Sequence, residues 1–152
     1  MPKEGSAAPA FATTDANGLT VRLKDLRGRK VVLYFYPKDD TPGCTKEACS
    51  FRDSFAEFKK RGITVLGISP DAEASHKKFA AKFNLPFTLL TDKDHSIADA
   101  YDTYGEKKFM GRTYMGVKRT TFLIDEKGKI KKIFEKVKPD EHAREVLDAF
   151  EN

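Results

Sequence analysis

The two cysteines of this chain, Cys44 and Cys49, lie five positions apart in one short segment. Six apolar or aromatic residues at positions 31–36 precede the segment, and this run predicts a buried strand. Apolar residues then recur at the three- and four-residue spacing of a helix face: Ala48, Phe51, Phe55 and Phe58. Cys44 is therefore expected where the loop after a strand turns into a helix.

The start of a helix favours a cysteine thiolate over a thiol. Its backbone N–H groups have no partners within the helix, and the helix dipole is positive there. A thiolate is the reactive form of cysteine, so the position indicates redox chemistry. A structural pair would more usually bridge distant parts of the chain. Two incidental core cysteines are the alternative that this placement leaves open.

Pro37, Thr41 and Cys44 form the pattern Pro-x-x-x-Thr-x-x-Cys, which resembles the active-site motif of the peroxiredoxins. The run Thr-Pro-Gly-Cys-Thr-x-x-Ala-Cys, which ends at Cys49, is similar to the peroxiredoxin Q subfamily, also called bacterioferritin comigratory protein. Arg119 corresponds to the active-site arginine of that family, just before a late strand. The resemblance extends along nearly the whole chain. It implies a thioredoxin-like fold, hydroperoxide substrates, and recycling by thioredoxin or a similar dithiol reductant.

Each of these residue types suits one step of peroxide reduction. The thiolate of Cys44 would attack a peroxide oxygen, and the guanidinium of Arg119 would stabilise both the anionic sulfur and the polarised O–O bond. The hydroxyl of Thr41 can donate to sulfur or accept from the peroxide, and Pro37 can end the strand and shield the thiolate. The sulfenic acid formed on Cys44 would condense with Cys49 into an intramolecular disulfide. Taken singly, Thr41 could instead be a helix cap, Pro37 a turn residue and Arg119 a surface cation.

Two other kinds of site are weighed against the peroxidase. A thioredoxin-like disulfide oxidoreductase normally uses Cys-x-x-Cys, whereas four residues separate the two cysteines here. A metal site would need clustered ligands, but His76, His95 and His142 lie far apart in the sequence. We therefore expect no metal and no cofactor, and we interpret each histidine as a surface or helix residue.

Length and composition predict a single globular domain over residues 1–152. The net charge of +5 comes from lysine-rich segments near residues 107–119 and 127–138. We interpret these as solvated sheet edges rather than a nucleic-acid surface, because no nucleic-acid-binding motif accompanies them. No run is long enough to span a membrane, and the N-terminus lacks an apolar signal core. The expectation is a cytoplasmic protein without membrane contact, and the family resemblance implies a monomer.

The order of the predicted elements is that of an α/β protein. We expect a hairpin over residues 11–23, with Leu19, Val21 and Leu23 on a half-buried face. One helix would run from Cys44 to about Arg61. We expect strands at 63–69 and 88–91, further helices at 70–85, 97–101 and 143–150, and a second hairpin at 121–134. Residues 105–116 are expected to form an irregular loop whose methionines could touch the active site. The fold class is thus a thioredoxin-like fold, with a central mixed β-sheet flanked by helices and an N-terminal β-hairpin.

Overall fold

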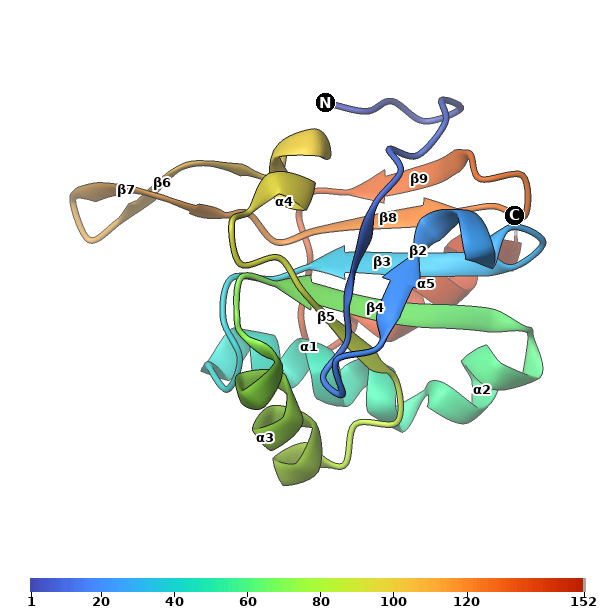
Figure 1. The fold of residues 1–152 in the computed structure, drawn as a ribbon, viewed down its shortest axis with the longest axis horizontal. Helices are drawn as coiled ribbons and strands as arrows, with labels where there is room; N and C mark the ends of the chain where they lie inside the picture. The colour runs from blue at the N-terminus through green and yellow to red at the C-terminus, as the bar shows by residue number, and fades with distance from the viewer. Residues whose placement is uncertain (152) are drawn as a thin grey trace.

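The computed structural model describes residues 1–151, and a five-stranded mixed sheet lies at its centre (Figure 1). The strands follow the order β5-β4-β3-β8-β9, with bounds Thr88–Thr91, Ile63–Ser69, Lys30–Phe35, Thr120–Ile124 and Ile130–Phe134. β3 pairs in parallel with β4 and antiparallel with β8. The predicted mixed sheet is therefore confirmed. Asn152, the last residue of the predicted single domain, lies outside the described residues.

Side chains on the two faces of β3 enter two separate cores, because successive side chains of a strand point to opposite faces. Val32 and Tyr34 lie in the core beneath four helices, whose bounds are α1 Pro42–Asp53, α2 Phe55–Lys60, α3 Glu73–Phe83 and α5 His142–Glu151. Leu33 and Phe35 lie in the opposite core, which α4 (Ser96–Ala100) and the turn η1 (Leu23–Leu26) help to cover. Both faces of the central strand are thus buried, as its continuous apolar sequence predicts.

The predicted N-terminal hairpin is confirmed as β1 (Ala12–Thr14) paired antiparallel with β2 (Thr20–Arg22). The carboxylate of Asp15 accepts the backbone N–H groups of Asn17 and Leu19 and so closes the turn. The predicted burial of Leu19 is wrong. Its side chain is 65% exposed, because the residue belongs to the turn rather than to the paired strand.

The predicted helix from Cys44 to Arg61 is in fact two helices. α1 ends at Asp53, and Ser54 leaves helical geometry before α2 begins at Phe55. The end of α2 matches the prediction, since Gly62 adopts a positive φ of 69° there. α3 begins at Glu73 rather than at the Pro70–Asp71 pair, because the carboxylate of Asp71 binds groups of the preceding loop instead.

The expected irregular loop at 105–116 is wrong, because these residues form a regular hairpin. β6 (Tyr104–Phe109) and β7 (Arg112–Val117) pair antiparallel and extend away from the central sheet, at the left of Figure 1. Met110 and Gly111 both have positive φ, which suits a two-residue turn between twisted strands. The remaining predicted elements are confirmed as β4, β5, α4, the β8–β9 hairpin and α5. Among the described residues, no helix combines the length and the apolar character needed to cross a membrane.

Candidate active site

Cys44 lies in the first turn of α1, at the end of the loop that follows β3. Thr41 is the residue before the helix, and its carbonyl accepts the first helical hydrogen bond from the N–H of Thr45 at 2.8 Å. Pro42 occupies the first helical position, where its missing N–H costs nothing. The thiol of Cys44 is only 1% exposed, so the positive end of the helix dipole acts on it with little screening by water.

Arg119 reaches the sulfur of Cys44 from the other side of the site, between β7 and β8. Its Nη2 lies 3.3 Å from Cys44 Sγ, and its Nη1 lies 2.6 Å from Glu47 Oε1. Burial by itself would lower the pKa of the Arg119 guanidinium, but the charges of Glu47 and Cys44 raise it. Gly43 permits this approach, since a Cβ there would come within 3.0 Å of Arg119 Nη2. The structure therefore brings the predicted arginine and cysteine into direct contact.

Glu47 is a member of this site that the sequence reasoning missed. Its side chain is fully buried, and this burial raises the pKa of its carboxyl to about 7 against the opposing effect of Arg119. Oε1 accepts from Arg119, while Oε2 has no hydrogen-bond partner among residues 1–151. A signal for Glu47 was present, because residues three apart share a helix face and Glu47 follows Cys44 by three. An acidic residue on a face that also carries Ala48 and Phe51 is unusual.

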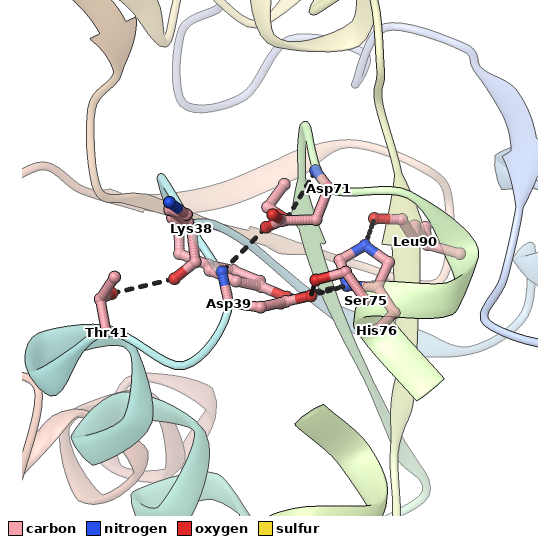
Figure 2. Close-up of polar contacts among 9 residues, drawn as sticks. Lys38, Asp39, Thr41, Asp71, Ser75, His76 and Leu90 are labelled. Carbon is pink, nitrogen blue, oxygen red and sulfur yellow. Dashed lines mark hydrogen bonds and ion pairs between the residues drawn. The ribbon is translucent and has the colours of Figure 1, made fainter. Parts of the chain in front are cut away.

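Thr41 and Pro37 line the entrance to the site rather than contacting the sulfur. The hydroxyl of Thr41 donates to the carbonyl of Lys38 at 2.9 Å, as Figure 2 shows. Its oxygen lone pairs are then oriented by that bond and remain able to accept a hydrogen bond from a substrate. Both residues border a groove of about 700 Å³ that β6 and β7 also line.

The side of the groove formed by the β6–β7 hairpin is mainly apolar. It is lined by Tyr104, Lys107, Phe109, Tyr114, Met115, Gly116 and Val117. Met115 thus reaches the entrance of the site, as the sequence suggested it could. Met110 does not line the groove, because it stands in the hairpin turn with 86% of its side chain exposed.

Cys49 lies farther along the same helix and is half-buried. Residues five apart in an α-helix have Cα atoms roughly 8.5 Å apart, from a rise of about 1.5 Å and a turn of about 100° per residue. A disulfide requires Cα atoms no more than about 7 Å apart. Both cysteines carry free thiols. The intact helix therefore holds the two thiols apart.

Each histidine has its own partners in the structure. His76 and His142 are buried residues of α3 and α5, as the helix interpretation predicted, and each makes hydrogen bonds through both ring nitrogens. His95 lies just before α4, and its ring stacks on Tyr104 with centroids 3.7 Å apart.

Comparison with known proteins identifies this arrangement. The AhpC/TSA family description matches residues 5–133. Peroxiredoxin Bcp of Bacillus subtilis is 47% identical over 148 residues, which cover 97% of this chain and 94% of that protein. Among solved structures, a cysteine-to-serine mutant of Xylella fastidiosa PrxQ is similar with a TM-score of 0.93 and 32% identity, covering 99% of this chain and 96% of that one.

A second similar structure is that of the Xanthomonas campestris bacterioferritin comigratory protein, which was studied for its alkyl peroxide reduction activity. It has a TM-score of 0.87 and 37% identity, covering 93% of this chain and 90% of that chain. These relatives match the fold along nearly its whole length and do not favour a disulfide oxidoreductase. The chain belongs to the AhpC/TSA family, as a thiol-dependent peroxidase of the peroxiredoxin Q and bacterioferritin comigratory protein group.

Proposed function

We propose that this peroxidase reduces hydrogen peroxide and organic hydroperoxides through the thiolate of Cys44. The observation that carries the proposal is the 3.3 Å contact between Arg119 Nη2 and Cys44 Sγ at the first turn of α1. A cation and a helix start both stabilise negative charge on that sulfur. The second sulfur, on Cys49, sits in mid-helix, away from the helix start.

The first chemical step is a two-electron transfer from sulfur to oxygen. The Cys44 thiolate attacks one peroxide oxygen, the O–O bond breaks, and the other oxygen leaves with the electron pair and takes up a proton. The sulfur becomes a sulfenic acid, and the product is water or an alcohol. Arg119 stabilises the charge as it moves from sulfur to the leaving oxygen, while the oxygen of Thr41 accepts the peroxide O–H. Pro37 excludes water at the groove entrance.

The second step consumes the sulfenic acid. The thiol of Cys49 attacks the oxidised sulfur of Cys44, water leaves, and an intramolecular disulfide forms. A dithiol such as thioredoxin then reduces the disulfide by thiol exchange and is itself oxidised. The roughly 8.5 Å spacing in helical geometry means that α1 must open before this bond can close.

Substitution of each cysteine tests the two roles. Cys44→Ser should abolish peroxide consumption in stopped-flow measurements with hydrogen peroxide and an organic hydroperoxide. Cys49→Ser should retain one fast turnover and accumulate a sulfenic acid that a dimedone-type reagent traps and mass spectrometry places on Cys44. Rapid peroxide consumption by the Cys44→Ser protein through Cys49 would show that the two roles are reversed.

The groove supports organic hydroperoxides as substrates alongside hydrogen peroxide. Phe109, Met115 and Val117 offer apolar surface in the same groove as Thr41 and Pro37. We also propose a monomer that works in the cytoplasm, where a dithiol reductant can be kept reduced. Sedimentation of the reduced and oxidised protein tests the monomer. Turnover with thioredoxin, compared with turnover with glutathione, tests the reductant.

A further inference from the structure

The loop that leads into the active site is tied to the rest of the protein by one buried carboxylate. Asp39 is 7% exposed and accepts hydrogen bonds through both of its oxygens (Figure 2). Oδ1 accepts the hydroxyl of Tyr36, and Oδ2 lies 2.8 Å from Ser75 Oγ and 2.7 Å from His76 Nδ1. The backbone N–H of Asp39 donates to Asp71 Oδ2 at 2.8 Å. Asp39 thus joins the loop before α1 to α3 and to the end of β4.

The hydrogen bonds of His76 define where its ring protons lie. Its Nε2 is 2.8 Å from the carbonyl oxygen of Leu90 in β5, and a carbonyl can only accept, so Nε2 carries a proton. Its Nδ1 is 2.7 Å from Asp39 Oδ2. Two hydroxyl donors also converge on Asp39, which favours an ionised carboxylate as the acceptor and a second proton on Nδ1.

We propose that His76 is a positioning residue for the peroxidase reaction: as a buried imidazolium paired with Asp39, it holds the loop that places Pro37 and Thr41 beside Cys44. The loop needs such a tie, because Asp40 adopts a φ of 57°, a backbone conformation that is uncommon for residues other than glycine. His76 acts on the arrangement of the loop, whereas Arg119 stabilises the sulfur of Cys44.

A metal ion is the other chemistry that these side chains could suggest. Asp39, Asp71 and His76 offer ligand atoms within 4.8 Å of one another. Each of these atoms is already engaged in a hydrogen bond, and both ring nitrogens of His76 face acceptors. These three side chains therefore fit an ion pair between His76 and Asp39 that is supported by hydrogen bonds.

The tie depends on both ring protons of His76. The groups that face the ring are the carboxylates of Asp39 and Asp71, the hydroxyl of Tyr36 and the carbonyl of Leu90. Tyr36 stays neutral, because burial raises the pKa of its hydroxyl well above the usual range. If Nδ1 of His76 lost its proton, the buried carboxylate of Asp39 would lose one of its hydrogen-bond donors. The tie is therefore present while the ring is doubly protonated.

Nitrogen-15 NMR of the reduced full-length protein tests the charge state without relying on activity. At neutral pH, both ring nitrogens of His76 should show the chemical shifts of protonated nitrogen, with an attached hydrogen on each. His95, which is partly exposed, provides an internal comparison in the same spectrum. A ring of His76 with one unprotonated nitrogen would overturn the proposal.

Kinetics of His76→Gln in a Cys49→Ser background test the positioning role. The substitution removes the charge but keeps polar atoms, and displacement of the loop should slow the single-turnover peroxide reaction by about tenfold or more. Alkylation of Cys44 by iodoacetamide should change little, because Arg119 and the helix start are untouched.

Two control variants remove neighbouring bonds without removing the buried charge. Ser75→Ala deletes another donor to the same oxygen of Asp39, and Lys82→Ala deletes the exposed ion pair with Asp40 in the same loop. Both should react with peroxide at nearly the parent rate. An unchanged peroxide rate in folded His76→Gln would overturn the proposal, and Asp39→Asn serves as the second variant if His76→Gln does not fold.

The proposal rests on the role proposed for Cys44, and the experiments separate the two. If Cys44→Ser still consumed peroxide rapidly, the function would be assigned wrongly whatever His76 does. If Cys44→Ser is inactive and the ring of His76 is neutral, only the positioning role fails.

Discussion

The guanidinium of Arg119 contacts the sulfur of Cys44 and the carboxyl group of Glu47. Arg119→Met retains most of the side-chain bulk but removes the charge and both donors. We expect the second-order rate with hydrogen peroxide to fall by roughly one to three orders of magnitude, the range for losing one preorganised stabiliser. Stopped-flow measurements under excess peroxide would give this rate directly.

Arg112→Met is the matched control for that substitution. Arg112 is an exposed cation of β7, so its loss changes the net charge equally without touching the sulfur. Its rate should stay close to that of the parent protein. Equal rates for the two variants, both folded, would place Arg119 outside the reaction.

Burial of Glu47 makes the stability of the folded protein depend on pH. Its carboxyl has a pKa of about 7 when folded, above the ordinary value of 4.5, so the folded state holds the proton more tightly. The stabilisation is complete below pH 4.5 and is lost as the pH rises through 7. Glu47→Gln cannot titrate. Between pH 4.5 and 8, the free energy of unfolding of the parent should therefore fall by on the order of 3 kcal/mol relative to that of Glu47→Gln.

Urea unfolding of both proteins at several pH values, under reducing conditions, measures this difference. Other titrating groups, such as the buried His142, are present in both proteins and cancel. Parallel stability curves for Glu47→Gln and the parent would contradict the prediction.

At the residue scale, the sequence pointed to residues that the structure partly brings together, since Arg119 lies 3.3 Å from the sulfur of Cys44. Cys44 and Thr41 follow from a short motif, and the position of Arg119 follows from the family resemblance. Glu47 was within reach, since it lies one helical turn from Cys44. The contact between Asp39 and His76 was not, because it joins residues 37 positions apart through the packing of α3 against a loop.

At the scale of elements, the proposed mechanism requires α1 to change shape. Its intact form holds Cys44 and Cys49 too far apart for a disulfide, so oxidation should unwind the helix from Cys44 to about Arg52. The following helix α2 should stay in place, because Phe58 is fully buried in the core. Amide hydrogen exchange should show lost protection over residues 44–52 in the oxidised protein and none in Cys49→Ser treated alike.

Non-reducing electrophoresis must accompany the exchange measurement. A disulfide between two chains would need no unwinding, whereas an oxidised monomer requires the bond to close within one chain. An oxidised monomer with a Cys44–Cys49 bond and full protection of residues 44–52 would contradict the prediction.

The hairpin of β6 and β7 was not predicted from the sequence, and its exposure explains why. Phe109, Met110, Tyr114 and Met115 are all substantially exposed, so neither strand has the alternation of buried and exposed residues that signals a sheet. The turn is Met-Gly rather than the stronger signal Asn-Gly. The central strands, by contrast, are buried on both faces and were recognised from continuous apolar runs.

At the scale of the whole molecule, the positive charge agrees with the interpretation of lysines as edge protection. β9 forms one edge of the central sheet and carries Lys131 and Lys132, both exposed. Their ammonium groups lie over the rings of Phe150 and Phe134, at 5.8 and 5.3 Å from the ring centroids. Charged side chains at an edge strand discourage pairing with a second chain, which supports the proposed monomer.

The last prediction concerns the stability of the whole protein in its two redox states. Closing a loop of about six residues by a disulfide stabilises a chain by roughly 2 kcal/mol through the unfolded state. Opening the first turns of α1 breaks several backbone hydrogen bonds, each worth roughly 1 kcal/mol, and exposes Cys44 and Ala48, which are buried in the reduced protein. The loss exceeds the gain, so the oxidised protein should be the less stable form, although most disulfides stabilise.

Calorimetry of the reduced and oxidised protein at pH 7 tests this balance. The oxidised form should unfold about 3 to 10 °C lower, the shift expected when a protein of this size loses one to a few kcal/mol. The double variant with Cys44→Ser and Cys49→Ser should unfold at one temperature whether or not oxidant is present. An oxidised protein with an equal or higher unfolding temperature would mean that α1 accommodates the bond without opening. A lower temperature would also explain how a dithiol reduces the bond readily, because reduction lets α1 regain its hydrogen bonds and its buried surface.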